Sequence, residues 1–212
     1  MTSLDATAPV SVPDAHRQAK YQVRFDWGLD GVAAIASDAD VVVRVDALPA
    51  APGSHPGPDA GSGALAELAG VPADAAVLAA GLTDATAVAR WILDEQVRLG
   101  RRAMVALVAV GGTTPSGSPR FAVEDLLAAG AVVDALAAVG IDYCSPEAAA
   151  ACAAFTGLRG AVAHLLTASV SGQERLAAGE SPAEVAAAGR LGAVEAVTVL
   201  RASRSTGAGP AE

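Results

Sequence analysis

The stretch SPRFAVEDLLAAG, residues 118–130, decides how the fold of this chain is predicted. Ser118 is a suitable helix N-cap and Pro119 suits the first position of a helix, so we expect a helix over about 119–138. This helix is apolar on nearly every side, which is typical of a buried helix. The stretch therefore predicts a core helix around which the other elements pack.

Three charged side chains lie in the first two turns of this apolar helix: Arg120, Glu124 and Asp125. Burying such charges costs several kcal/mol each unless they find partners or a metal ion. Arg120 and Glu124 are four residues apart, a spacing that lets two side chains meet on one helix face. A polar, glycine-rich loop at 111–117 comes just before. We therefore expect a site where a strand, this loop and a helix N-terminus meet.

Strands and helices are expected to alternate along the chain, with patterns of period two or nearly continuous valine marking the strands. The expected strands are 21–27, 41–48, 75–80, 103–110 and 194–200, and the expected helices are 29–36, 65–69, 83–99, 119–138, 145–155 and 161–167. Capping-box spacing at Ser171 and Ser181 indicates two further helix starts, and Thr83 is the expected cap of the third helix. The alternation predicts a three-layer α/β/α sandwich with a mostly parallel or mixed central sheet.

Length and composition favour a single domain, because 212 residues that are 52% apolar can bury one sizeable core. We assign residues 20–202 to this domain and 1–19 and 203–212 to flexible tails. Within the domain, 49–63 is a loop rich in proline and glycine.

The formal net charge of −9 argues against a protein that binds nucleic acid or anionic membranes. Two cysteines, Cys144 and Cys152, do not make a disulfide framework and favour a reducing compartment. No signal peptide is recognisable, and no apolar run reaches the roughly 18 residues that a membrane span needs. A cytoplasmic location is therefore expected.

Six sequence blocks stand in a fixed order along the chain: QVRFDWG at 22–28, VVVRVDAL at 41–48, AVARW at 87–91, RFAVEDLLAAGA at 120–131, SPEA at 145–148 and SGQE at 171–174. In this order they resemble the ComB family, the 2-phosphosulfolactate phosphatases, and the resemblance spans roughly residues 20–201. The resemblance implies an α/β/α fold and magnesium-dependent release of phosphate from 2-phospho-3-sulfolactate.

Several polar groups of the family pattern are replaced in this chain. The Ser/Thr-rich turn after Asp46 reads Ala-Leu-Pro-Ala-Ala, and a Ser-Pro-Asn-Gly-Ser type turn has no counterpart. An Arg-Asn-Ala element reads Thr83-Asp84-Ala85-Thr86, with Asp84 at the position of the Asn, and a Gly-Glu pair reads Gly111-Gly112. The scaffold pattern is therefore retained better than the active-site pattern.

A phosphatase needs positive charge against the phosphoryl group, N–H groups for its oxygens, and a placed water or nucleophile. Magnesium prefers oxygen ligands, so Asp46 and Glu124 are the candidate metal ligands. Glu124, Asp125 and Arg120 are the candidate catalytic residues. The alternatives are that Asp46 caps a neighbouring turn or helix and that Arg120, instead of clamping a phosphate or sulfonate, neutralises Glu124.

The candidate substrate-binding groups are backbone N–H groups at two places. Gly111 and Gly112 precede a helix start, where an anion is stabilised. Ser171 and Gly172 could bind an oxyanion in the same way, although a capping box is the simpler and favoured explanation.

Two functions are therefore predicted. The first is a magnesium-dependent phosphatase that hydrolyses a small anionic phosphomonoester similar to 2-phosphosulfolactate. The second is a degenerate, non-catalytic family member that binds an anionic phosphate or sulfonate metabolite or a protein partner. Proteins of this kind are often symmetric dimers, so a homodimer is the expected assembly.

Overall fold

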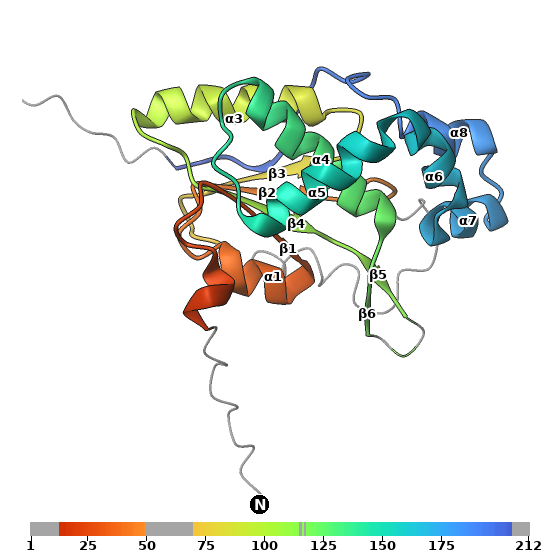
Figure 1. The fold of residues 1–212 in the computed structure, drawn as a ribbon, viewed down its shortest axis with the longest axis horizontal. Coiled ribbons are helices and arrows are strands. Elements are labelled where there is room, and N and C mark those ends of the chain that lie inside the picture. The colour runs from red at the N-terminus through yellow and green to blue at the C-terminus, as the bar shows by residue number, and fades with distance from the viewer. Residues whose placement is uncertain (1–12, 50–69, 115, 117, 205–212) are drawn as a thin grey trace, which may run out of the picture.

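A computed structural model, which describes residues 13–49, 70–114, 116 and 118–204, contains a five-stranded central sheet (Figure 1). The strand order is β1-β4-β2-β3-β7. Four strands are parallel: β1 (Val23–Trp27), β4 (Val105–Ala109), β2 (Val41–Val45) and β3 (Ala76–Ala80). The edge strand β7 (Thr198–Arg201) pairs antiparallel with β3. The carboxyl ends of the four parallel strands therefore lie along one edge of the sheet.

Helices cover both faces of this sheet. One face carries α3 (Ala85–Leu99), α4 (Val123–Ala138) and α5 (Pro146–Leu158), and the other carries α1 (Gly28–Ile35) (Figure 1). The predicted three-layer α/β/α sandwich with a mixed sheet is confirmed.

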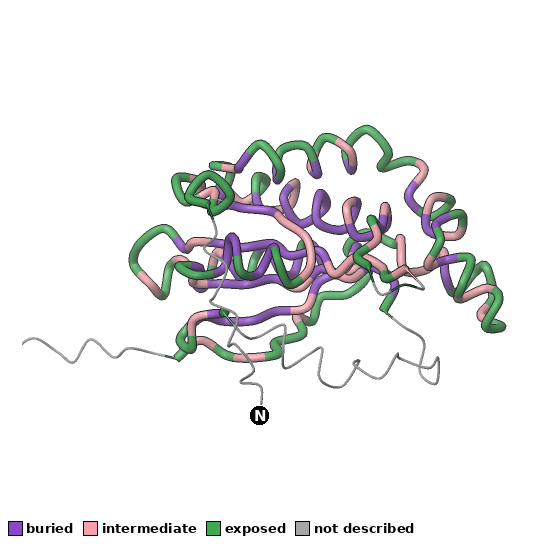
Figure 2. The backbone as a smooth tube through the Cα atoms, turned by 90° about the horizontal axis from the view of Figure 1, so that it is seen from below, coloured by how far each residue is buried: buried purple, intermediate pink, exposed green. Residues whose placement is uncertain are grey.

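The two faces of the strands follow from their period of two. In β2, Val41, Val43 and Val45 pack toward the helices α3–α5, whereas Val42 packs toward α1. Every residue of β4 is buried, as expected for a continuous apolar strand covered on both sides. The buried part of the chain in Figure 2 runs through these central strands and the inner sides of the helices.

The chain after α5 forms a group of short helices beside the sheet. They are η2 (Arg159–Ala161), α6 (Val162–Ala168), α7 (Val170–Ala177) and α8 (Pro182–Ala187). The helical run Pro146–Ala168 is long and apolar enough to cross a membrane by length and composition alone. Its residues Ala151, Phe155 and Leu166 belong to the core beside the sheet, and 22% of its most apolar 18-residue window is buried.

The start of the fold-deciding helix was predicted wrongly. Gly111, with φ at +72°, turns the chain, and β5 (Gly112–Thr113) then pairs antiparallel with β6 (Pro119–Arg120) in a two-stranded ribbon. The helix α4 begins only at Val123. Pro119 lacks an N–H group and so fits an edge strand as well as a helix start. Pairing with Gly112–Thr113 is what makes Pro119 part of a strand and not the start of a helix.

The helix caps were predicted with mixed success. Ser145 caps α5, and Ser181 forms a complete capping box with Glu184, as expected. Ser171 is not a cap, because Ser169 caps α7 and its Oγ accepts the N–H of Gly172. Thr83 is not a cap either, since Asp84 is the residue before α3.

Several expectations fall on residues outside the described part of the chain. The helix expected at 65–69 and nearly all of the 49–63 loop belong to this group, as do most residues of both predicted tails. Of the amino-terminal tail, Asp14–Arg17 forms a short 3-10 helix, η1. The last strand begins at Thr198, four residues after the predicted start.

Candidate functional site

The side chain of Asp125 ties together the carboxyl ends of two strands. Asp125 is the third residue of α4 and is 3% exposed. Its Oδ1 accepts the N–H of Ala47 at 2.8 Å, and its Oδ2 accepts the N–H of Gly111 at 2.9 Å. Ala47 follows β2 and Gly111 follows β4, so one carboxyl group fixes the two neighbouring strand ends against the start of α4.

Burial raises the pKa of Asp125 to about 7. The two N–H groups that bind the carboxyl oppose this rise, whereas the negative charges of Asp46 and Glu124 add to it. Three acids thus interact electrostatically at one edge of the sheet. A buried acid that titrates near neutral pH beside other acids is a frequent property of functional sites.

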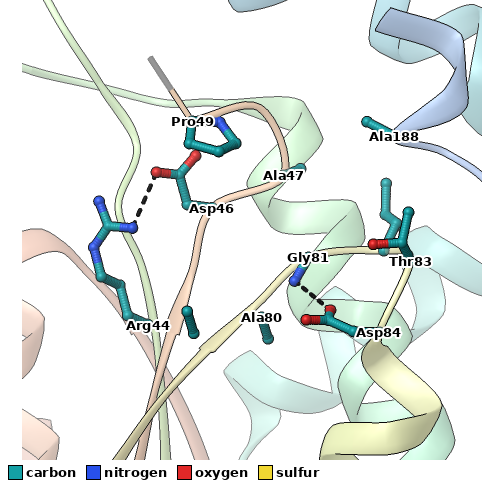
Figure 3. A pocket seen from close by; sticks show the side chains of 11 residues that line it. Arg44, Asp46, Ala47, Pro49, Ala80, Gly81, Thr83, Asp84 and Ala188 are labelled. Atoms are coloured by element: carbon teal, nitrogen blue, oxygen red, sulfur yellow. Dashed lines mark hydrogen bonds and ion pairs between the residues drawn. The ribbon is translucent and has the colours of Figure 1, made fainter. Parts of the chain in front are cut away.

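An open cavity of about 220 Å³ lies at the ends of β2 and β3 (Figure 3). Its polar lining includes the side chains of Arg44, Asp46, Thr83 and Asp84, and its remaining walls are apolar. Nη1 of Arg44 lies 3.1 Å from Oδ2 of Asp46. A cavity this small suits a small metabolite better than a drug-sized or polymeric ligand.

The N-terminus of α3 forms one side of this cavity. Oδ1 of Asp84 accepts the N–H of Gly81 at 2.8 Å, as Figure 3 shows, and does not cap the helix. The first N–H groups of α3 therefore have no side-chain cap, and the positive end of the helix dipole faces this region.

Glu124 is the most unusual side chain of the site. It is 2% exposed, and its Oε1 is fully buried with no hydrogen-bond partner. Among the described residues, no hydrogen bond or ion pair reaches its carboxyl group. The predicted alternative in which Arg120 neutralises Glu124 is therefore wrong, and the reason is that Arg120 lies on β6 and not on the helix.

Arg120 lies instead against Gly112 in the two-stranded ribbon. A Cβ on Gly112 would lie 2.5 Å from Nη2 of Arg120 and 2.8 Å from its Cζ. Within the described part of the chain, the only hydrogen bond found for this guanidinium is a long one of 3.5 Å from Nη1 to the carbonyl oxygen of Phe121. The ring of Phe121 packs 5.2 Å from that of Trp27, at the end of β1.

Ser171 and Gly172 lie in α7 and do not line the cavity, although Arg175 of the same helix donates to the carbonyl oxygen of the cavity residue Pro49. The N–H of Gly172 already donates to Oγ of Ser169 at 3.0 Å. A Cβ on Gly172 would lie 1.9 Å from the carbonyl oxygen of Leu166, so this glycine allows α6 and α7 to approach closely. The geometry gives Gly172 a packing role.

The structure brings together only part of the predicted set. Asp125 contacts Gly111 and interacts with Asp46 and Glu124, but only Asp46 of these lines the cavity. Arg120 and Gly112 form a separate pair on the ribbon. The sequence reasoning did not select Arg44, although a single arginine within an otherwise all-valine strand was the signal that could have identified it.

The donor chemistry of the edge is compatible with magnesium, although the residues that the structure describes do not form a complete metal site. Among the described residues, no group of three His, Cys, Asp or Glu side chains could hold a metal ion. Magnesium needs only one or two carboxylates when water and a phosphate complete its shell. The buried Glu124 carboxyl group, which lacks a donor, and the cavity-lining Asp46 are the side chains that would hold it.

No protein-family model matches this chain, and a search of curated proteins finds no similar sequence.

Proposed function

We propose that this chain is a ComB-like phosphatase that hydrolyses a small phosphomonoester carrying a second anionic group. The observation that carries the proposal is the buried carboxyl group of Glu124, which has no donor and lies next in sequence to Asp125. Burying a carboxyl group without a hydrogen-bond partner costs free energy, and a bound cation would relieve that cost. Magnesium at Asp46 and Glu124 would supply positive charge against the phosphate oxygens.

The chain's own residues have distinct tasks in this proposal. Arg44 lines the cavity and its guanidinium suits a phosphate oxygen pair, in exchange for part of its contact with Asp46. The uncapped N–H groups at the start of α3 favour a negative group on the same side. Asp125 holds the loops after β2 and β4 in place, and with a pKa of about 7 it can bind or release a proton near neutral pH.

A second candidate function is binding of an anionic metabolite without turnover. Both oxygens of Asp125 are occupied by backbone N–H groups, and the two acids Asp46 and Asp84 line the same small cavity. These contacts favour a group of structural acids over a complete catalytic set. The two candidates differ in whether phosphate is released.

The test is release of inorganic phosphate by the purified full-length chain, with and without magnesium. The substrates are 2-phosphosulfolactate and simple phosphate esters, and the variants are Glu124→Gln and Asp46→Asn. We expect each variant to lower kcat/KM by at least about 100-fold, as the loss of one electrostatic group in an active site does. The matched control is Glu195→Gln, an exposed acid for which we expect unchanged activity.

Magnesium-induced thermal stabilisation provides a second measurement on the same proteins. A ligand at 100 times its Kd stabilises the folded state by about 2.7 kcal/mol, so magnesium should raise the Tm of the parent and not that of Glu124→Gln. Turnover that does not depend on magnesium, or equal turnover by Glu124→Gln and the parent, contradicts the proposed mechanism. If the folded protein binds phosphate but hydrolyses none of these esters, the second candidate function is established.

A further inference from the structure

We infer that Arg120, seated on Gly112, is an oxyanion-binding site for a sulfonate or carboxylate group. The identity of this ligand rests on the proposed function. The seat itself rests on the geometry of the ribbon and of Arg120 alone.

Gly112 makes a seat for the guanidinium because it has no side chain. A Cβ there would lie 2.5 Å from Nη2, 2.8 Å from Cζ and 2.9 Å from Nε of Arg120. Three atoms of one planar group at such distances mean that the guanidinium lies in the space that a side chain would fill. Gly112 and Arg120 are also direct cross-strand partners in the β5–β6 ribbon, so the pairing register holds them together.

This guanidinium lies against Gly112, and no acid among the described residues neutralises it. No carboxylate pairs with Arg120 among the residues that the structure describes, in contrast to Arg24, Arg98 and Arg101, which all pair with acids. It does not lie over an aromatic ring either, since the cation–π contacts found in the described chain involve Lys20 and Arg159. Its hydrogen bond to the carbonyl of Phe121 is 3.5 Å long.

A positioned guanidinium with most of its N–H groups unused is a preorganised receptor for a planar or tetrahedral oxyanion. Preorganisation raises affinity because less side-chain entropy is lost on binding. The adjacent Gly111 is fixed by Asp125, so the ribbon base is anchored to the same sheet edge as the acids. Phe121, the next residue in the chain, is 59% exposed, and its ring packs against that of Trp27.

The test measures binding of methanesulfonate and of inorganic phosphate, each alone, to the purified chain by NMR titration of the Gly112 amide and the Arg120 Nε–H. We expect Arg120→Gln to weaken binding by about ten- to a hundredfold, the range for losing a charged hydrogen-bond partner. Gly112→Ala should weaken it as well without removing any charge. The clash falls on the far end of a flexible side chain, so this variant should remain folded.

The control is Arg102→Gln, an exposed arginine that precedes β4 at the opposite end of the sheet. The inference is overturned if the parent binds neither anion at millimolar concentration, if Arg120→Gln binds as the parent does, or if Arg102→Gln weakens binding equally. This test measures binding and not turnover, so it can support the anion site even if the proposed phosphatase activity is not found. Conversely, if the protein is an active phosphatase but Arg120→Gln keeps its affinity for anions, only this inference is contradicted.

Discussion

Replacing Gly130 by alanine tests the closest helix contact in the fold. Gly130 lies in the middle of α4, where a Cβ would be 2.1 Å from the carbonyl oxygen of Ala151 and 2.7 Å from Cβ of Phe155, both in α5. A carbon and an oxygen normally approach to about 3.3 Å, so α4 and α5 must separate by about 1 Å. The atoms struck are mainly backbone, which cannot rotate away as the tip of a side chain can.

The expected effect is a net loss of stability. Overpacking typically costs about 1–3 kcal/mol, and a backbone clash of this depth belongs at about 3. Alanine returns about 1 kcal/mol through its higher helix propensity, which leaves a loss of about 2 kcal/mol. For a domain of this size that lowers Tm by about 4–8 °C.

Gly157→Ala is the matched control because Gly157 is an exposed residue of α5 with no atom within 4 Å of the position that a Cβ would take. At that position only the gain from the higher helix propensity of alanine remains, so Tm should rise by about 2–4 °C. Both values come from thermal unfolding followed by circular dichroism. Equal stability of Gly130→Ala and the parent would refute the close packing of α4 on α5.

Two further predictions concern single side chains. Asp38→Asn removes the acidic partner of the buried Arg24, whose side chain is 1% exposed. We expect it to lower the free energy of unfolding at pH 7 by about 1–2 kcal/mol, less than for a fully buried pair because Asp38 is half exposed. The hydrogen bond from Arg24 holds the pKa of Asp38 below its ordinary value, so this stability is present above about pH 4 and is lost as pH falls through the lowered pKa. Urea unfolding should therefore give converging values for parent and variant at about pH 2–3, and a constant difference would contradict the ion pair. Asp125→Asn sets an NH₂ group against one of two N–H donors, so we expect a loss of about 1–3 kcal/mol and faster amide exchange at Ala47 and Gly111. Unchanged exchange at both amides would contradict the role of Asp125 in holding the ends of β2 and β4 together.

The sequence predicted the central strands well because their patterns reflect burial directly. The strand at Val23–Trp27 alternates in polarity, and Val105–Ala109 is continuously apolar, so each indicates both its position and its environment. The β5–β6 ribbon was missed because strands of two residues carry no periodic pattern. Ser118-Pro119 has the same local signature as the true helix start at Ser145-Pro146, and only pairing with Gly112–Thr113 separates them.

The candidate site could be placed from sequence only to within one turn of helix. Asp46 and Asp125 were selected because charges at a strand end and at the start of an apolar helix are unusual, and the structure places them near one another. Arg44 was not selected, since the side of the strand on which a cavity opens depends on which elements cover it. The pairing of Arg120 with Gly112 likewise depends on the ribbon register.

The division of roles between Glu124 and Asp125 follows from helix geometry. Neighbouring residues on an α-helix point roughly 100° apart, so only one of two consecutive acids can face the ends of β2 and β4. Asp125 takes that direction and meets two N–H donors, whereas Oε1 of Glu124 is buried without one. A shift of one residue in the start of α4 would exchange the two roles, and the sequence alone does not fix that phase. The contact of Asp125 with the ends of β2 and β4 therefore also explains why the adjacent Glu124 lacks a donor. For this reason we expect changes at these strand ends to alter the binding of a ligand at Glu124.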